Sequence, residues 1–155
     1  MIETILSDDD LIRCVRYVRL KESMSVGLKD AHGLVVNQME SFEISLIGAK
    51  GELGFCRLAG LPWDGENRLN TFKAADVGAL IQVRTTRRTN PRLVVRNRDN
   101  ERHSYCLMSV HGPIVRYWGW ILGLEAKRPE WVDAPYGRPP AWFVPKEALR
   151  EGFPE

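Results

Sequence analysis

The spacing of apolar residues near the start of the chain is typical of an amphipathic helix. In residues 7–24, SDDDLIRCVRYVRLKESM, apolar side chains recur at Leu11, Val15 and Val18. Ser7 is a good N-cap, and the three aspartates that follow it place negative charge in the first turn, where the helix dipole favours it. We therefore predict a helix here, with a break in the pattern at residues 27–33.

A second helical pattern covers residues 38–58. Gly60 and Pro62 end it, since neither residue continues a helix readily. Its apolar stripe consists of Phe42, Leu46, Ala49, Leu53 and Cys56. Residues 60–72 follow as a predicted loop.

After this loop the apolar period changes to two, which indicates strands. The strand candidates are ALIQVRTT (79–86), RLVVRN (92–97), HSYCLMSV (103–110) and IVRYWGWILG (114–123). Turn signals stand between them, such as Gly112-Pro113. Trp118 and Trp120 are two residues apart and are therefore expected on one face of the last strand.

The order of these elements predicts an α/β (α+β) protein in which helices precede a central mixed β-sheet. We expect one domain over residues 1–155. It would comprise a helical segment (1–36), a core (37–128) and an extended tail rich in proline and tryptophan (129–155), with a short helix near residues 146–149.

Composition and charge restrict the class of protein. The chain has 155 residues, 44% of them hydrophobic and 27% charged, with a net charge of +2. This is ordinary for a globular domain. The three cysteines lack CxxC spacing, and neither a secretion signal nor a membrane span is visible. We expect a cytoplasmic protein that does not enter a membrane.

Positive charge is concentrated in one segment of this nearly neutral chain. Residues 84–102 contain seven arginines against Asp99 and Glu101. Such a local excess can bind polyanions. Arg87, Arg88, Arg92 and Arg96, with Lys73 nearby, are therefore candidate nucleic-acid contacts. The alternative is a solvated charged face.

A group of polar residues just before these arginines suggests a catalytic site. Gln82 and Arg84 alternate on a strand and so share a face, and Gly78 permits a turn that brings Asp76 close. Glu52 lies among glycines on the second helix, where glycine costs about 1 kcal/mol relative to alanine. Close approach of that helix to a sheet would explain the glycines and would carry Glu52 over the strand edge.

Two carboxylates and an amide oxygen suit Mg²⁺ or Mn²⁺, and an arginine beside the metal can stabilise charge on a phosphate. Glu52, Asp76 and Gln82 are thus candidate metal ligands. Simpler interpretations remain open. Asp76 would be a turn residue, Gln82 and Arg84 a solvent-facing strand pair, and Glu52 an exposed helix residue.

The order of a helix glutamate, an aspartate and a strand carrying Gln-x-Arg resembles the PD-(D/E)XK nucleases, the restriction-endonuclease-like fold. Longer runs such as GAKGELGFCRLAGLPWDG and WGWILGLEAKRPEW also resemble a group of small phage and prophage proteins. The resemblance covers residues 44–150. It implies metal-dependent hydrolysis of DNA in the host cytoplasm, and it is compatible with a homodimer.

The resemblance assigns roles residue by residue. Glu52 matches the helix acid, Asp76 the metal-binding aspartate, Gln82 the second motif acid and Arg84 the motif lysine. The sequence departs from the motif because Ala75 replaces proline, glutamine replaces a carboxylate, and an arginine is a poor general base. An inactive nucleic-acid-binding domain and a protein-interaction module of a phage are therefore alternative functions.

Overall fold

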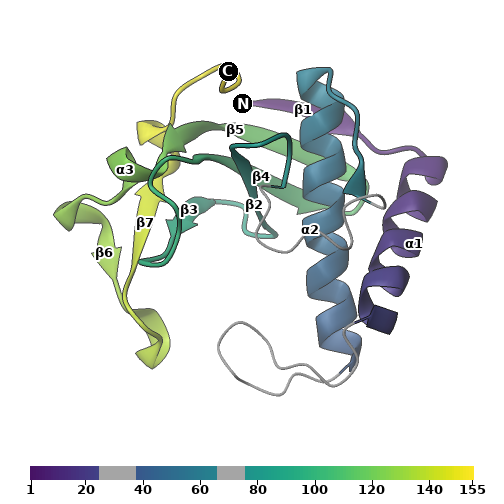
Figure 1. Cartoon of the computed structure of the whole chain (residues 1–155), viewed down its shortest axis with the longest axis horizontal. Coiled ribbons are helices and arrows are strands. Elements are labelled where there is room, and N and C mark those ends of the chain that lie inside the picture. Colours follow the sequence, from purple (N-terminus) through teal and green to yellow (C-terminus); the bar gives the residue numbers. More distant parts are fainter. Residues whose placement is uncertain (25–37, 66–75) are drawn as a thin grey trace.

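The computed structural model describes residues 1–24, 38–65 and 76–155 of the chain. The short strand β1 (Ile2–Ile5) comes first. Two long helices follow, α1 (Asp8–Met24) and α2 (Gln38–Ala59), and the remaining strands come after them (Figure 1). The predicted α+β class, with N-terminal helices preceding a mixed sheet, is confirmed. None of the helices in the described ranges has the length and apolar character needed to cross a membrane.

The predicted N-cap forms at the start of α1. The backbone N–H of Asp10 donates to Ser7 Oγ at 3.1 Å, and the N–H of Ser7 donates to Asp10 Oδ2 at 3.0 Å. Arg57 of α2 also donates to Asp10, at 2.6 Å. Burial raises the pKa of Asp10, but these hydrogen bonds outweigh that effect and leave the pKa below its ordinary value. Asp10 thus takes part in the cap of α1 and also ties α1 to α2.

The main sheet has four strands in the order β1-β5-β4-β2. Strand β2 (Ile81–Thr86) runs parallel to β4 (Ser104–His111), whereas the remaining pairs are antiparallel. β5 (Ile114–Leu122) joins β4 to β1 (Ile2–Ile5), a strand that the sequence pattern did not predict. β2 therefore stands at one edge of the sheet.

A second sheet, separate from the first, has the order β3-β7-β6. The segment predicted as the strand RLVVRN forms β3 (Arg92–Val95), but it pairs with β7 (Ala141–Pro145) of the tail rather than with the main sheet. β6 (Val132–Asp133) completes this sheet. Short helices also occur in the described residues 123–148, namely α3 (Gly123–Ala126), η2 (Pro129–Trp131), η3 (Pro135–Gly137) and η4 (Lys146–Ala148).

Each face of the main sheet has its own hydrophobic core. On one face, Val83, Cys106 and Met108 pack beneath the helices with Leu53 and Phe55 of α2. On the opposite face, a smaller cluster joins the main sheet to the second sheet. It consists of Leu93, Val95, Tyr105, Leu107, Ile121, Ala126 and Val144. The molecule is thus layered as helices, main sheet and second sheet (Figure 1).

The glycines of α2 allow the helix to lie close against the main sheet, as the sequence predicted. A Cβ atom at Gly51 would lie 1.9 Å from Thr85 Oγ1 of β2, and one at Gly54 would lie 2.4 Å from Val115 Cγ2 of β5. Gly48 faces open space and has no such role. Two of the three glycines therefore mark the contact between helix and sheet.

One expectation about β5 is wrong. Trp118 packs with the smaller cluster and Trp120 with the helix-side core, so the two rings lie on opposite faces of the sheet. The register between β4 and β5 shifts opposite Gly119, between Leu107 and Met108. Because a bulge of this kind inserts one extra residue, the simple alternation of faces fails there.

Candidate nucleic-acid interface

Asp76 lies at the free edge of β2. Its Oδ2 accepts a hydrogen bond of 2.8 Å from the backbone N–H of Val83. Gly78, with a φ of 58°, reverses the chain between Val77 and Ile81, which form an antiparallel bridge. The aspartate thus lies beside the strand of Gln82, as the sequence predicted, and it binds a backbone donor that an edge strand leaves without a partner.

Gln82 and Arg84 share a face of β2, as expected, but this face lies away from the helices. They are in register with Tyr105 and Leu107, which belong to the smaller cluster. Gln82 Nε2 lies 3.1 Å from His103 Nδ1. The Arg84 guanidinium packs over the Tyr105 ring at 5.3 Å.

Glu52 lies on α2, on the other side of the main sheet. Its Oε2 accepts a hydrogen bond of 3.4 Å from Nε1 of Trp63. Trp63 in turn packs edge-on against Tyr17 of α1 and beneath Arg13. The glutamate therefore faces the surroundings of the two helices, not the face that carries Gln82 and Arg84.

The structure thus does not bring together the four residues matched to the nuclease motif. Glu52 and the pair Gln82 and Arg84 lie on opposite sides of the main sheet, with Asp76 at its edge. Among the described residues, no three His, Cys, Asp or Glu side chains are arranged to hold a metal ion. Metal-dependent DNA hydrolysis stays a prediction of the resemblance and gains no geometric support here.

The contact between Asp76 and Val83 gives this aspartate a structural role. We expect Asp76→Ala to lower the free energy of unfolding by about 1–3 kcal/mol, because the N–H of Val83 loses its acceptor. Asp76→Asn keeps a side-chain oxygen and should cost less. Urea unfolding of the three proteins measures the difference. Equal stability of Asp76→Ala and wild type would contradict this role.

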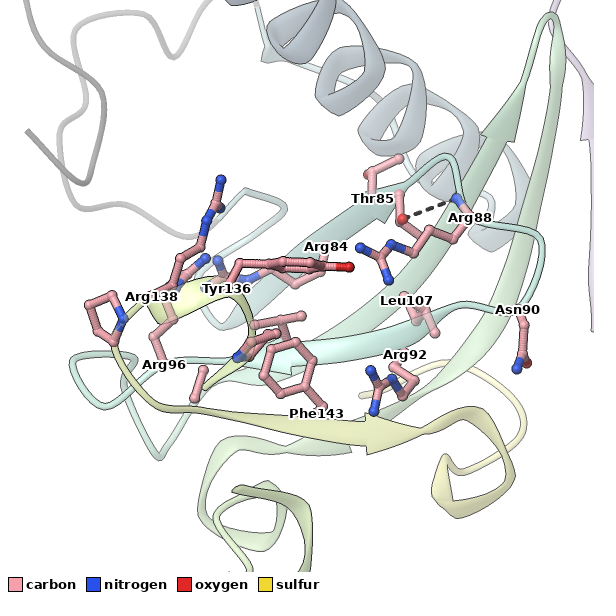
Figure 2. Close-up of a pocket in the computed structure, with 15 residues that line it drawn as sticks. Arg84, Thr85, Arg88, Asn90, Arg92, Arg96, Leu107, Tyr136, Arg138 and Phe143 are labelled. Carbon is pink, nitrogen blue, oxygen red and sulfur yellow. Dashed lines mark hydrogen bonds between the residues drawn. The ribbon is translucent and has the colours of Figure 1, made fainter. Parts of the chain in front are cut away.

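A cleft of about 510 Å³ lies beside β2, between the two sheets and the segment 135–141. Figure 2 shows its walls. One wall is the end of β2 with the turn that follows, the floor is β3, and the opposite wall is the segment around Tyr136 and Arg138. Its lining includes five arginines, at positions 84, 88, 92, 96 and 138.

Within the described ranges, Arg84 is the one arginine of this set that is paired with a carboxylate. Its guanidinium lies 2.9 Å from Asp99 Oδ1. The other oxygen of Asp99 accepts the backbone N–H of Arg96 at 2.8 Å, and the carboxylate is largely buried. Asp99 therefore neutralises Arg84 and fixes the turn that follows β3.

The remaining four arginines of the cleft have no acidic partner within the described part of the chain. They are Arg88, Arg92, Arg96 and Arg138. Arg92 instead lies over the ring of Phe143 at 5.0 Å, which orients its guanidinium without cancelling its charge. The cleft thus gathers about four uncompensated positive charges.

Three of the predicted nucleic-acid contacts, Arg88, Arg92 and Arg96, line this cleft. Arg87 is exposed but is not part of the lining. Lys73 lies outside the described residues.

Sequence reasoning missed Tyr136, Arg138 and Phe143, which come from the tail. Proline before and glycine after Tyr136 indicate a tight turn that exposes the tyrosine, and this signal was available in APYGRPP. The pairing of β7 with β3, which carries this turn to the arginines, was not visible in the pattern.

The cysteines take no part in the cleft. Cys14, Cys56 and Cys106 are buried, and none of them forms a disulfide with another described residue. Burial raises the pKa of Cys14 and Cys106 to about 12, so both remain protonated thiols near neutral pH. All three belong to the core between the helices and the main sheet.

Comparisons with protein families, with curated proteins and with solved structures returned no match for this chain.

Proposed function

We propose that this protein binds nucleic acid through the arginine cleft. The observation that carries the proposal is the convergence on one concave surface of four arginines that have no carboxylate partner among the described residues. Keeping like charges together is unfavourable unless an anion neutralises them. A repeated anion such as a phosphodiester backbone can engage several of them together.

The cleft also has the mixture of side chains that nucleic acid requires. Arginines bind phosphates through charge-assisted hydrogen bonds, often with two parallel contacts. Tyr136 and Phe143 lie among these arginines and add aromatic surface (Figure 2). Basic residues interleaved with aromatic ones are typical of surfaces that track a nucleic-acid backbone.

The resemblance to nucleases and the arginine cleft both suggest a nucleic-acid ligand, but the cleft gives no support for hydrolysis of that ligand. The cleft contains Arg84 and excludes Glu52, Asp76 and Gln82 from its lining. Binding without hydrolysis is therefore the function that the geometry supports best. It corresponds to the alternative of an inactive nucleic-acid-binding domain.

The salt dependence of binding tests the proposal. Fluorescence anisotropy with a labelled oligonucleotide should give a log–log slope of affinity against salt of about −0.7 per phosphate contact on a single strand, hence about −3 for four contacts. Single substitutions of Arg88, Arg96 or Arg138 by alanine should each reduce the steepness by about 0.7.

Arg19→Ala is the matched control. Arg19 is an exposed arginine of α1 and is not in the lining of the cleft. It should leave the slope unchanged. The proposal fails if the wild-type protein binds no oligonucleotide at low salt, or if Arg19→Ala changes the slope as much as the cleft variants do.

A further inference from the structure

Tyr136 combines two unfavourable features. Its backbone is left-handed, with a φ of 58° and a ψ of 29°, a conformation that is unfavourable for a non-glycine residue. Its side chain is 90% exposed, so burial of the ring does not offset this cost. Pro135 and Gly137 hold the turn, and the N–H of Arg138 donates to the carbonyl of Pro135 at 3.2 Å.

The strained turn presents the ring to the arginines. Figure 2 shows the Tyr136 ring lying across the cleft, with Arg88 on one side and Arg96 and Arg138 on the other. No ring contact or cation–π contact within the described residues involves Tyr136. The flat face of the Tyr136 ring is thus accessible and lies between arginines that can bind phosphates.

We propose that the cleft binds single-stranded nucleic acid and that the ring of Tyr136 stacks on one of its bases. This inference rests on the proposed function and specifies its ligand. A duplex keeps its base faces inside the stack and can offer an exposed tyrosine only backbone and groove edges. A single strand exposes base faces, and stacking on aromatic side chains is the usual way of binding them.

The size of the cleft agrees with this ligand. A volume of about 510 Å³ is typical of a site for a small organic molecule, and so accommodates about one or two nucleotides. The remaining phosphates of the strand would lie along the arginines at its rim. Because every base has a π-face, stacking of this kind implies little sequence preference.

The test compares three ligands of matched backbone length: a mixed-sequence DNA strand of about 12 nucleotides, its duplex, and an abasic strand that keeps the phosphates without bases. An RNA strand of the same sequence shows whether the protein prefers single-stranded DNA or single-stranded RNA. Wild type should bind the two single strands that contain bases, DNA and RNA, more tightly than the abasic strand. Tyr136→Ala should weaken binding to the base-containing strands about tenfold.

Tyr136→Phe is the conservative control. It keeps the ring and should bind like wild type, whereas Tyr136→Ala and wild type should bind the abasic strand equally. Tyr136→Gly should also weaken binding to the base-containing strands. It should raise the melting temperature by about 2–4 °C, because glycine accepts the left-handed backbone.

The outcomes separate the inference from the proposed function. If Tyr136→Ala binds the base-containing strands as tightly as wild type, with salt dependence intact, stacking is wrong and backbone binding remains. A duplex bound more tightly than the single strand would overturn the inference in the same way. If none of the four nucleic acids binds, the proposed function itself fails.

Discussion

Gly119→Ala is expected to lower the free energy of unfolding by roughly 2–6 kcal/mol, a large part of the ~5–15 kcal/mol that holds a typical domain folded. Gly119 has a φ of 132°, which side chains rarely adopt. A Cβ atom there would also lie 2.6 Å from the carbonyl oxygen of Arg150 and 2.9 Å from Leu149 Cβ. Neither neighbour is the flexible end of a side chain.

The clash matters because the C-terminal segment pairs with β5 at this point. The N–H of Trp120 donates to the carbonyl of Arg150 at 3.1 Å, and the N–H of Arg150 donates to the carbonyl of Trp120 at 2.8 Å. A methyl group at position 119 would push β5 and this segment apart. It would also disturb the aromatic cluster of Phe55, Tyr117 and Phe153, which the same segment completes.

Comparison with Gly152→Ala separates the cost of the backbone strain at position 119 from the cost of the steric clash there. Gly152 also has a positive φ, 74°, but open space surrounds its would-be Cβ. Alanine there should cost only about 1–2 kcal/mol. Thermal and urea unfolding of the two variants measures the difference. Equal losses at both positions would show that the contact with Arg150 is unimportant.

The two helices and the class of fold were predictable because their signals are local. Ser7 and Asp10 lie within one turn, and the apolar stripe of α2 repeats within a few residues. The glycines of α2 also predicted that this helix packs closely on a sheet, since the cost of glycine in a helix has to be offset by contact. Information of this kind does not depend on the rest of the chain.

The arrangement of the strands was less predictable because strand pairing is not local. β1 pairs with β5, more than 100 residues further along the chain, and β3 pairs with β7 of the tail. Nothing in the short segment IETI or in the tail specifies these partners. The segment that forms β3 was therefore predicted as a strand of the central sheet, and β6 and β7 were predicted only as parts of an extended tail.

The lack of long-range information in the sequence pattern also explains why the predicted catalytic residues do not come together. A period of two predicted correctly that Gln82 and Arg84 share a face, but it does not say which face the helices cover. The helices cover Val83, so Glu52 and the Gln82–Arg84 pair are separated by the sheet. The clustering of Arg88, Arg92 and Arg96 in one cleft depends less on which face the helices cover, because arginines are frequent along this segment.

Reversing two charges in the cleft should reduce nucleic-acid binding at low salt by about 100-fold or more. In the double variant Arg88→Glu/Arg138→Glu, two charge-assisted contacts worth about 1.5–3 kcal/mol each are lost and repulsion replaces them. The two residues stand on opposite walls of the cleft (Figure 2). Neither has a carboxylate partner among the described residues, so the fold should tolerate the change.

The control is a second double variant, Arg98→Glu/Arg102→Glu. Both residues are exposed, belong to the same arginine-rich segment and lie outside the lining of the cleft. Each replacement changes the charge by −2, so both double variants move from +2 to −2. Anisotropy titrations at one low salt concentration compare them. A cleft-specific site requires that the control lose far less affinity. If both variants lose it equally, the protein attracts polyanions only through its overall field, and the cleft is not the site.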